Sequence, residues 1–165
     1  MHILRAPWRM DYINSSNNDT QEQSCIFCVY PKEQNDAENL VLSRGEHVFA
    51  MLNRYPYSTG HVLIIPYRHT PLLESLTNEE KLEFMSITQI AIDVTKRTMK
   101  PDGFNLGINL GKVAGAGIDS HLHLHIVPRW NGDINFMSVT AEAKVLPEAL
   151  SVTWEKMIAS WPKNN

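Results

Sequence analysis

The chain has 165 residues, of which 43% are hydrophobic and 20% are charged, and these values predict one globular domain with a single core over residues 1–165. A formal net charge of −3 excludes a general attraction to nucleic acid or to anionic lipid, so we expect neither as a partner. No apolar stretch is long enough to span a bilayer or to serve as a signal peptide, and we expect a cytoplasmic protein.

The first 24 residues are expected to form an N-terminal arm. Within it, residues 14–24 are polar and low in complexity, which is typical of a flexible loop. Two cysteines follow at Cys-x-x-Cys spacing, Cys25 and Cys28. In a reducing compartment this spacing indicates metal binding, redox activity or two buried thiols.

The next segments predict a β-hairpin. Residues 33–39 are polar and predict a loop or a short turn. Residues 47–53 and 61–65 are rich in β-forming residues and predict two strands. The residues between them supply turn chemistry, namely Pro56, Ser58, Thr59 and Gly60.

A long helix is predicted from Thr77, because Thr77 and Glu80 have the spacing of a capping box. The helix is expected to run to about Met99 and to end before Pro101-Asp102-Gly103. The apolar face of this helix is predicted to consist of Leu82, Met85, Ile90, Ile92 and Val94.

The last third of the chain predicts two further strands and a final helix. The strands are expected over residues 104–110 and 121–127, joined by a glycine-rich loop over 111–120. Pro147 suits the first turn of a C-terminal helix over about 147–160. The fold class is therefore α+β: a mostly antiparallel β-sheet with one long helix on one face and a C-terminal helix.

Three histidines alternate with apolar residues in the second of these strands, at His121, His123 and His125. Side chains at i, i+2 and i+4 of a strand point to the same face, so the three imidazoles should lie together. Such a row is compatible with structural histidines, with a metal site or with phosphate chemistry. Imidazole is polar and titrates near neutral pH, which favours a solvated, chemically active surface.

The alternating pattern His-x-His-x-His, followed by two apolar residues, resembles the histidine-triad (HIT) superfamily of nucleotide hydrolases and transferases. Residues 52–66 resemble the nucleoside-binding hairpin of that superfamily. Residues 129–137 and 6–13 resemble its microbial branch, which is related to diadenosine tetraphosphate phosphorylases. The resemblance covers the chain from residue 4 to about residue 150 and implies a HIT-like fold that pairs into a homodimer.

The resemblance also implies roles for the catalytic residues. His123 would attack the α-phosphorus of a nucleotide and form a covalent nucleotidyl-histidine. His125 would donate a hydrogen bond to the phosphoryl oxygens. His121 would either order the site or, as in zinc-bearing relatives, bind the metal.

Further residues match substrate-binding positions of the superfamily. Asn53 corresponds to a ribose-binding residue and Asn109 to a residue near the phosphates, although either could serve as a turn or strand-end residue. Gly115, Ala116 and Gly117 form a small-residue loop whose N–H groups could bind an anion, or form a tight turn. Better-known branches carry a glutamine or a hydroxyl residue where Gly117 and Ile118 stand. Trp130 is expected over the base at the rim of the site, or against a partner subunit.

A structural zinc site is the cofactor that the resemblance implies. Zinc-bearing members use a Cys-x-x-Cys pair, a histidine after a Pro-x-x-His turn and the first histidine of the triad. The matching residues here are Cys25, Cys28, His69 and His121. Four protein ligands leave no open position for substrate, so the metal would support the structure.

These features predict a soluble nucleotidyl-transfer enzyme that cleaves dinucleoside polyphosphates such as diadenosine tetraphosphate, by phosphorolysis or hydrolysis. The alternatives are a nucleoside phosphoramidate hydrolase of the same superfamily, a nucleotide-binding regulator with little turnover, and a zinc-stabilised scaffold. An intact His123 argues against the regulator. The sequence leaves open the acceptor, the preferred base and the length of the polyphosphate.

Overall fold

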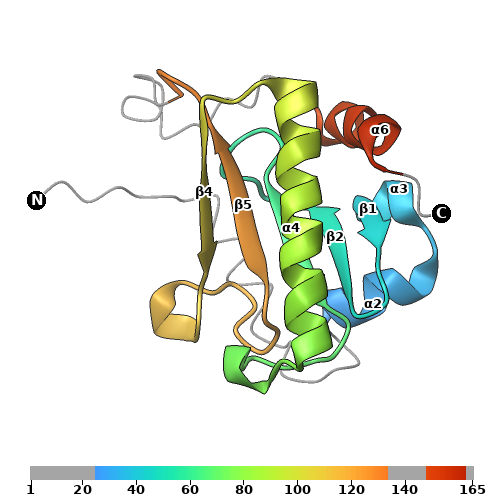
Figure 1. The fold of residues 1–165 in the computed structure, drawn as a ribbon, viewed down its shortest axis with the longest axis vertical. Coiled ribbons are helices and arrows are strands. Elements are labelled where there is room, and N and C mark those ends of the chain that lie inside the picture. The colour runs from blue at the N-terminus through green and yellow to red at the C-terminus, as the bar shows by residue number, and fades with distance from the viewer. Residues whose placement is uncertain (1–24, 134–147, 163–165) are drawn as a thin grey trace, which may run out of the picture.

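The computed structural model describes residues 25–133 and 148–162. The predicted N-terminal arm, Pro147 and the segment 134–147 lie outside the described residues. Within the described part, the strands form one antiparallel sheet, and helices come before, between and after them in the chain (Figure 1). No helix in these two ranges is long and apolar enough to cross a membrane.

Among the described residues, five strands form the sheet in the order β1-β2-β3-β5-β4, and every neighbouring pair is antiparallel. The strands are β1 (Val41–Arg44), β2 (Val48–Leu52), β3 (Val62–Pro66), β4 (Gly103–Ile108) and β5 (Leu124–Arg129). The predicted hairpin is confirmed as β2 and β3, in which Ala50 pairs with Ile64. β1 was not predicted.

Helices cover both faces of the sheet. The long helix α4 (Asn78–Met99) lies along one face, beside α6 (Leu150–Ser160), as Figure 1 shows. On the other face α2 (Ile26–Glu33) and the preceding residue, Cys25, pack against alternate residues of the same strands. The remaining short elements are α3 (Asp36–Asn39) and the 3-10 turns Leu73–Ser75 and Lys112–Ala114. The α+β prediction is confirmed, whereas α2 and α3 were not predicted as helices.

Side chains along the central strands point alternately to the two faces of the sheet and so belong to two separate apolar clusters. Val48, Ala50 and Leu52 face α4, and Phe49 and Met51 face α2. Both faces of β2 and β3 are therefore buried, which explains their nearly continuous apolar sequence.

The predicted apolar face of the long helix is partly wrong. Leu82 and Met85 are 72% and 54% exposed, while the buried stripe contains Phe84, Thr88, Ala91, Val94 and Thr95. Thr88 and Thr95 are polar, but their hydroxyls donate to the carbonyls of Phe84 and Ala91 within the helix. Because these threonines satisfy their own hydrogen bonds, they can occupy core positions that a hydrophobic pattern assigns to solvent. Ile90 and Ile92 pack at the edge of the core.

Candidate active site

The triad histidines stand at the start of β5. The regular strand begins at Leu124, three residues later than predicted, so His121 and His123 lie in the segment leading into it. Leu124 and Ile126 face the α4 core as the alternation requires. The expectation of a solvated row is wrong for two members, because His121 and His123 are only 1% and 5% exposed. His125 is half-buried.

A backbone carbonyl fixes the orientation of His123. Its Nδ1 lies 2.8 Å from the carbonyl oxygen of His121. A carbonyl oxygen only accepts hydrogen bonds, so Nδ1 carries the proton and Nε2 carries the lone pair. Burial lowers the pKa of His123 below its ordinary value and keeps the ring neutral. The site therefore contains an unprotonated imidazole nitrogen suited to nucleophilic attack.

His61 fixes the orientation of His125, and sequence reasoning assigned it no role. The backbone N–H of Tyr57 donates to Nδ1 of His61 at 3.0 Å, so the proton of a neutral His61 sits on Nε2. That Nε2 donates to Nδ1 of His125 at 2.9 Å, which leaves the proton of His125 on its own Nε2. His125 is thereby set to donate a hydrogen bond from Nε2. The sequence signal was a histidine directly before a buried strand.

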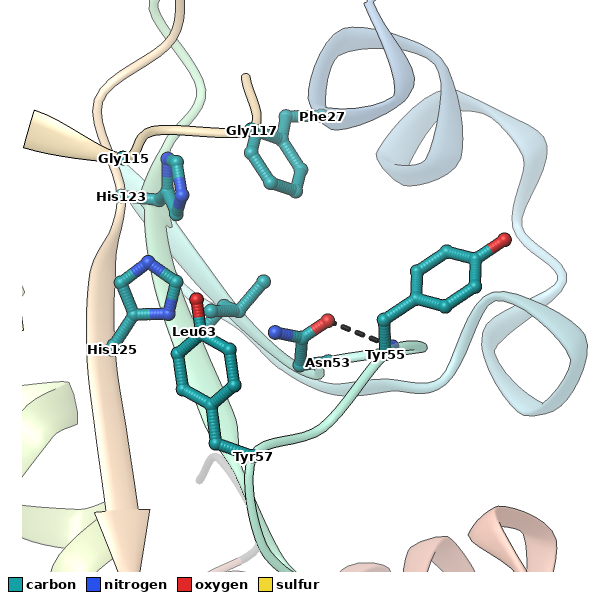
Figure 2. Close-up of a pocket in the computed structure, with 9 residues that line it drawn as sticks. All are labelled: Phe27, Asn53, Tyr55, Tyr57, Leu63, Gly115, Gly117, His123 and His125. Carbon is teal, nitrogen blue, oxygen red and sulfur yellow. Dashed lines mark hydrogen bonds between the residues drawn. The ribbon is translucent and has the colours of Figure 1, made fainter. Parts of the chain in front are cut away.

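These histidines open onto a pocket with about 450 Å³ of space, part of it continuous with solvent (Figure 2). Its lining residues are Phe27, Asn53, Tyr55, Tyr57, Leu63, Gly115, Gly117, His123 and His125. Five of them were expected from the sequence: Asn53, Gly115, Gly117, His123 and His125. The other four were not named individually: Tyr55, Tyr57 and Leu63 lie in the segment 52–66 that resembles a nucleoside-binding hairpin, and Phe27 comes from α2.

Three expected binding residues do not line this pocket: Asn109, Ala116 and Trp130. Asn109 precedes the glycine-rich loop and Ala116 lies within it, next to Gly115, whose φ of 88° is a conformation that favours glycine. Trp130 follows the end of β5, and at about 3.3 Å per residue it lies about 16 Å along the strand from His125. Asn53 does line the pocket, and its side-chain oxygen accepts from the backbone N–H of Tyr55 at 2.9 Å.

A second cluster adjoins the triad and consists of Cys25, Cys28, His69 and His121. The four donor atoms lie within 4.8 Å of one another. Sγ of Cys28 is 3.3 Å from Nδ1 of His69 and 3.5 Å from Nδ1 of His121, and Sγ of Cys25 is 3.4 Å from the latter. Tetrahedral zinc, with bonds of about 2.0–2.3 Å to nitrogen and sulfur, places its donor atoms about 3.3–3.8 Å apart. The cluster therefore fits a tetrahedral metal.

The outer hydrogen bonds of the cluster also suit a metal. Nε2 of His121 donates to the carbonyl oxygen of Pro66 at 2.8 Å, which leaves the lone pair of Nδ1 directed at the thiols. Metal-binding histidines are oriented in this way by carbonyl groups. Burial lowers the pKa of His121 to about 4, so the imidazole is neutral near pH 7. Phe27, between the two cysteines, packs against the rings of His121 and His123 at 5.6 and 5.1 Å.

Comparison with known proteins identifies the family. The model of the HIT domain matches residues 34–132, which is more than half of the chain. The chain belongs to the HIT domain family. Its triad, its hairpin and the glycine-rich loop all lie within the matched HIT region.

Individual relatives agree with this HIT assignment. The chain is 41% identical over 165 residues to a Mycobacterium tuberculosis protein named AP-4-A phosphorylase, covering 97% of this chain and 84% of the relative. It is 36% identical over 91 residues to the Saccharomyces cerevisiae bis(5'-adenosyl)-triphosphatase, covering 54% of this chain and 44% of the yeast protein. The crystal structure of a Zn-bound histidine triad family protein from Mycobacterium smegmatis superimposes with a TM-score of 0.67 at 26% identity, covering 85% of this chain and 94% of that one. The predicted HIT-like fold is confirmed.

The hydrogen bonds predict the proton positions of three imidazoles. We expect nitrogen-15 NMR spectra at neutral pH to show the proton of His123 on Nδ1 and the protons of His61 and His125 on Nε2. His47, outside the pocket, supplies an internal reference, and single His→Gln substitutions assign the signals. A His123 ring protonated on Nε2, or a His125 ring protonated on Nδ1, would contradict the geometry.

Proposed function

We propose that the protein cleaves dinucleoside polyphosphates, such as diadenosine tetraphosphate, by nucleotidyl transfer through His123. The observation that carries the proposal is the pair of adjacent, oppositely oriented imidazoles. His123 presents a lone pair on Nε2, and His125 presents a proton on Nε2, with the two ring centroids 4.8 Å apart. The relatives named for AP-4-A phosphorylase and bis(5'-adenosyl)-triphosphatase activities support this choice of substrate.

The reaction takes place in two displacements at one phosphorus atom. Nε2 of His123 attacks the α-phosphorus, a P–N bond forms, and the P–O bond to the departing nucleotide breaks with its electron pair. In the second displacement an oxygen of the acceptor attacks the same phosphorus, and the P–N bond breaks to restore neutral His123. His125 donates its Nε2–H to a phosphoryl oxygen as negative charge moves during each step.

Other lining groups position the nucleotide in this scheme. Asn53 binds the ribose hydroxyls through its amide, and the N–H groups of the loop Gly115-Ala116-Gly117 bind phosphate oxygens. Asn109 directly follows β4 and does not line the pocket, so the scheme gives it no contact with the substrate. The place of Trp130 beyond the far end of β5 favours contact with a partner subunit over stacking on the base within its own pocket.

The acceptor is inorganic phosphate in this proposal, because the relative named AP-4-A phosphorylase matches over nearly the whole chain. A phosphoramidate hydrolase would use the same histidines but take water as the acceptor and an amine as the leaving group. A regulator with little turnover would not need the paired orientation of His123 and His125.

Product analysis separates these functions. With diadenosine tetraphosphate we expect ADP and ATP to form only when inorganic phosphate is present, and His123→Ala to lower turnover roughly 10³-fold or more while nucleotide binding persists. AMP and ATP without phosphate would indicate a hydrolase instead. Wild-type protein that forms neither product pair, or an active His123→Ala variant, would contradict the proposal.

We further propose that Cys25, Cys28, His69 and His121 bind one structural zinc ion. The donor distances, the carbonyl partner of His121 and the Zn-bound relative from M. smegmatis support it. When bound, the ion would tie α2 and the segment after β3 to the segment that carries the triad. Thiolate ligands require reduced cysteines, so a cytoplasmic location belongs to the same proposal.

Metal analysis tests the zinc proposal. We expect one equivalent of zinc per chain, and Cys28→Ser should lower the melting temperature by roughly 5–10 °C, because metal binding is coupled to folding. Chelation should lower the stability of the wild type toward that of Cys28→Ser and leave the variant itself unchanged. A metal-free wild type with full thermal stability would overturn the proposal.

The proposal also includes a homodimer that pairs through β4. This strand is at the edge of the sheet, so one side of its backbone has no neighbour among the described strands. Leu106 on this strand is 46% exposed, and Leu110, two residues beyond its end, is 49% exposed. Apolar edge strands of this kind are ready sites for pairing with a second chain.

Light scattering at micromolar concentration tests this arrangement. We expect the wild type to have twice the mass of one chain and Leu106→Glu to shift it toward the monomer, because a charge would be buried at the paired edge. Val113→Glu is the matched control, since Val113 is fully exposed on the adjoining loop and should leave the dimer intact. A monomeric wild type would rule out the dimer.

A further inference from the structure

The ring of Tyr57 lies against two imidazoles at the wall of the pocket. Its centroid is 4.8 Å from that of His61 and 5.8 Å from that of His125, and the plane of its ring is 23° from that of His125. Figure 2 shows the Tyr57 ring beside His125, with the hydroxyl end directed toward the interior of the pocket. Tyr57 thus contacts the histidine pair through its side chain as well as through its backbone N–H.

The turn that carries Tyr57 is held in place from several sides. The hydroxyl of Ser58 donates to the carbonyl of Pro128 on β5 at 2.7 Å, and the N–H of His61 donates to the carbonyl of Ser58 at 3.2 Å. Gly60 adopts a φ of 74°, and a Cβ there would lie 2.5 Å from Sδ of Met99. The backbone therefore fixes where the Tyr57 ring stands relative to β5.

The plane of the His125 ring depends on its ring contacts as well as on the hydrogen bond from His61. The bond from His61 holds Nδ1, but the imidazole can still tilt about that contact and move Nε2 away from the phosphate. His123 meets the His125 ring at an interplanar angle of 64°, so it does not cover the face as a parallel ring does. The nearly parallel Tyr57 ring opposes the tilt.

We propose that Tyr57 is a positioning residue for nucleotidyl transfer: its aromatic face holds the plane of His125, so that the Nε2–H is aimed at the phosphoryl oxygen. The inference rests on the proposed function. The stacking surface carries this role, and the phenol hydroxyl does not.

Two substitutions separate the ring from the hydroxyl. Tyr57→Phe keeps the stacking face, and kcat should stay within about twofold of wild type. Tyr57→Val removes the face but keeps the backbone N–H that orients His61, and kcat should fall roughly 10- to 100-fold, as misplaced catalytic groups typically cause, with KM nearly unchanged. Equal losses in both variants, or a Tyr57→Val enzyme with wild-type kcat, would overturn the proposal.

A double-mutant cycle tests whether Tyr57 acts through His125. In the His125→Ala background, Tyr57→Val should change kcat by less than about twofold, because the group that it positions is already absent. Independent, multiplying losses would overturn the proposal. Phe104→Val is the matched control for lost stability: it removes a half-buried ring on β4, outside the pocket, and should leave kcat at the wild-type value.

A measurement without substrate keeps this inference separate from the proposed function. The Nε2–H signal of His125 in proton–nitrogen NMR spectra should be sharp in the wild type and in Tyr57→Phe, and broadened or lost in Tyr57→Val. Failure of the wild type to cleave diadenosine tetraphosphate would count against the proposed function. An unchanged His125 signal in Tyr57→Val would count against the positioning role.

Discussion

The hydrogen bond from Nδ1 of His123 to the carbonyl oxygen of His121 decides which nitrogen of His123, the proposed nucleophile, faces the pocket. That carbonyl belongs to His121, so the backbone position of His121 sets the orientation of the His123 ring. The same residue places its imidazole between two thiols and donates from Nε2 to Pro66 on β3. His121 therefore contributes its imidazole to the cluster of Cys25, Cys28 and His69, and its backbone carbonyl orients the ring of His123.

A chain of two hydrogen bonds orients the second imidazole, that of His125. One backbone N–H, from Tyr57, directs the proton of His61, and His61 directs the proton of His125. The two neighbouring rings consequently present opposite functions to the substrate, a lone pair on His123 and a proton on His125. Burial favours the neutral form of His123 because a charged imidazole loses its hydration there. Nucleophilic attack on a charged phosphate ester needs this combination of a neutral nucleophile and an adjacent donor.

Local patterns in the sequence predicted the parts of the molecule that depend on local geometry. The period of two in the triad predicted that His123 and His125 lie together, whereas His121 is directed at the two cysteines. The capping box located the start of α4. Contacts between distant segments were not predictable in the same way. His61, directly before β3, contacts His125 on the neighbouring strand β5, and Phe27 on α2 contacts His123. Neither contact produces a periodic pattern in the sequence. The buried face of α4 was predicted partly wrongly, because Thr88 and Thr95 are polar but lie in the core. Their hydroxyls donate hydrogen bonds to carbonyls of the same helix.

The central claim is that Nε2 of His123 forms a covalent bond to phosphorus. It is tested most directly by rapid acid-free quenching of wild-type protein with diadenosine tetraphosphate, followed by peptide mapping and phosphorus NMR of the modified peptide. We expect one nucleoside monophosphate per modified chain, joined to Nε2 of His123 by a P–N bond. An adduct on another residue or on Nδ1 of His123, or turnover with no adduct at any quench time, would contradict it.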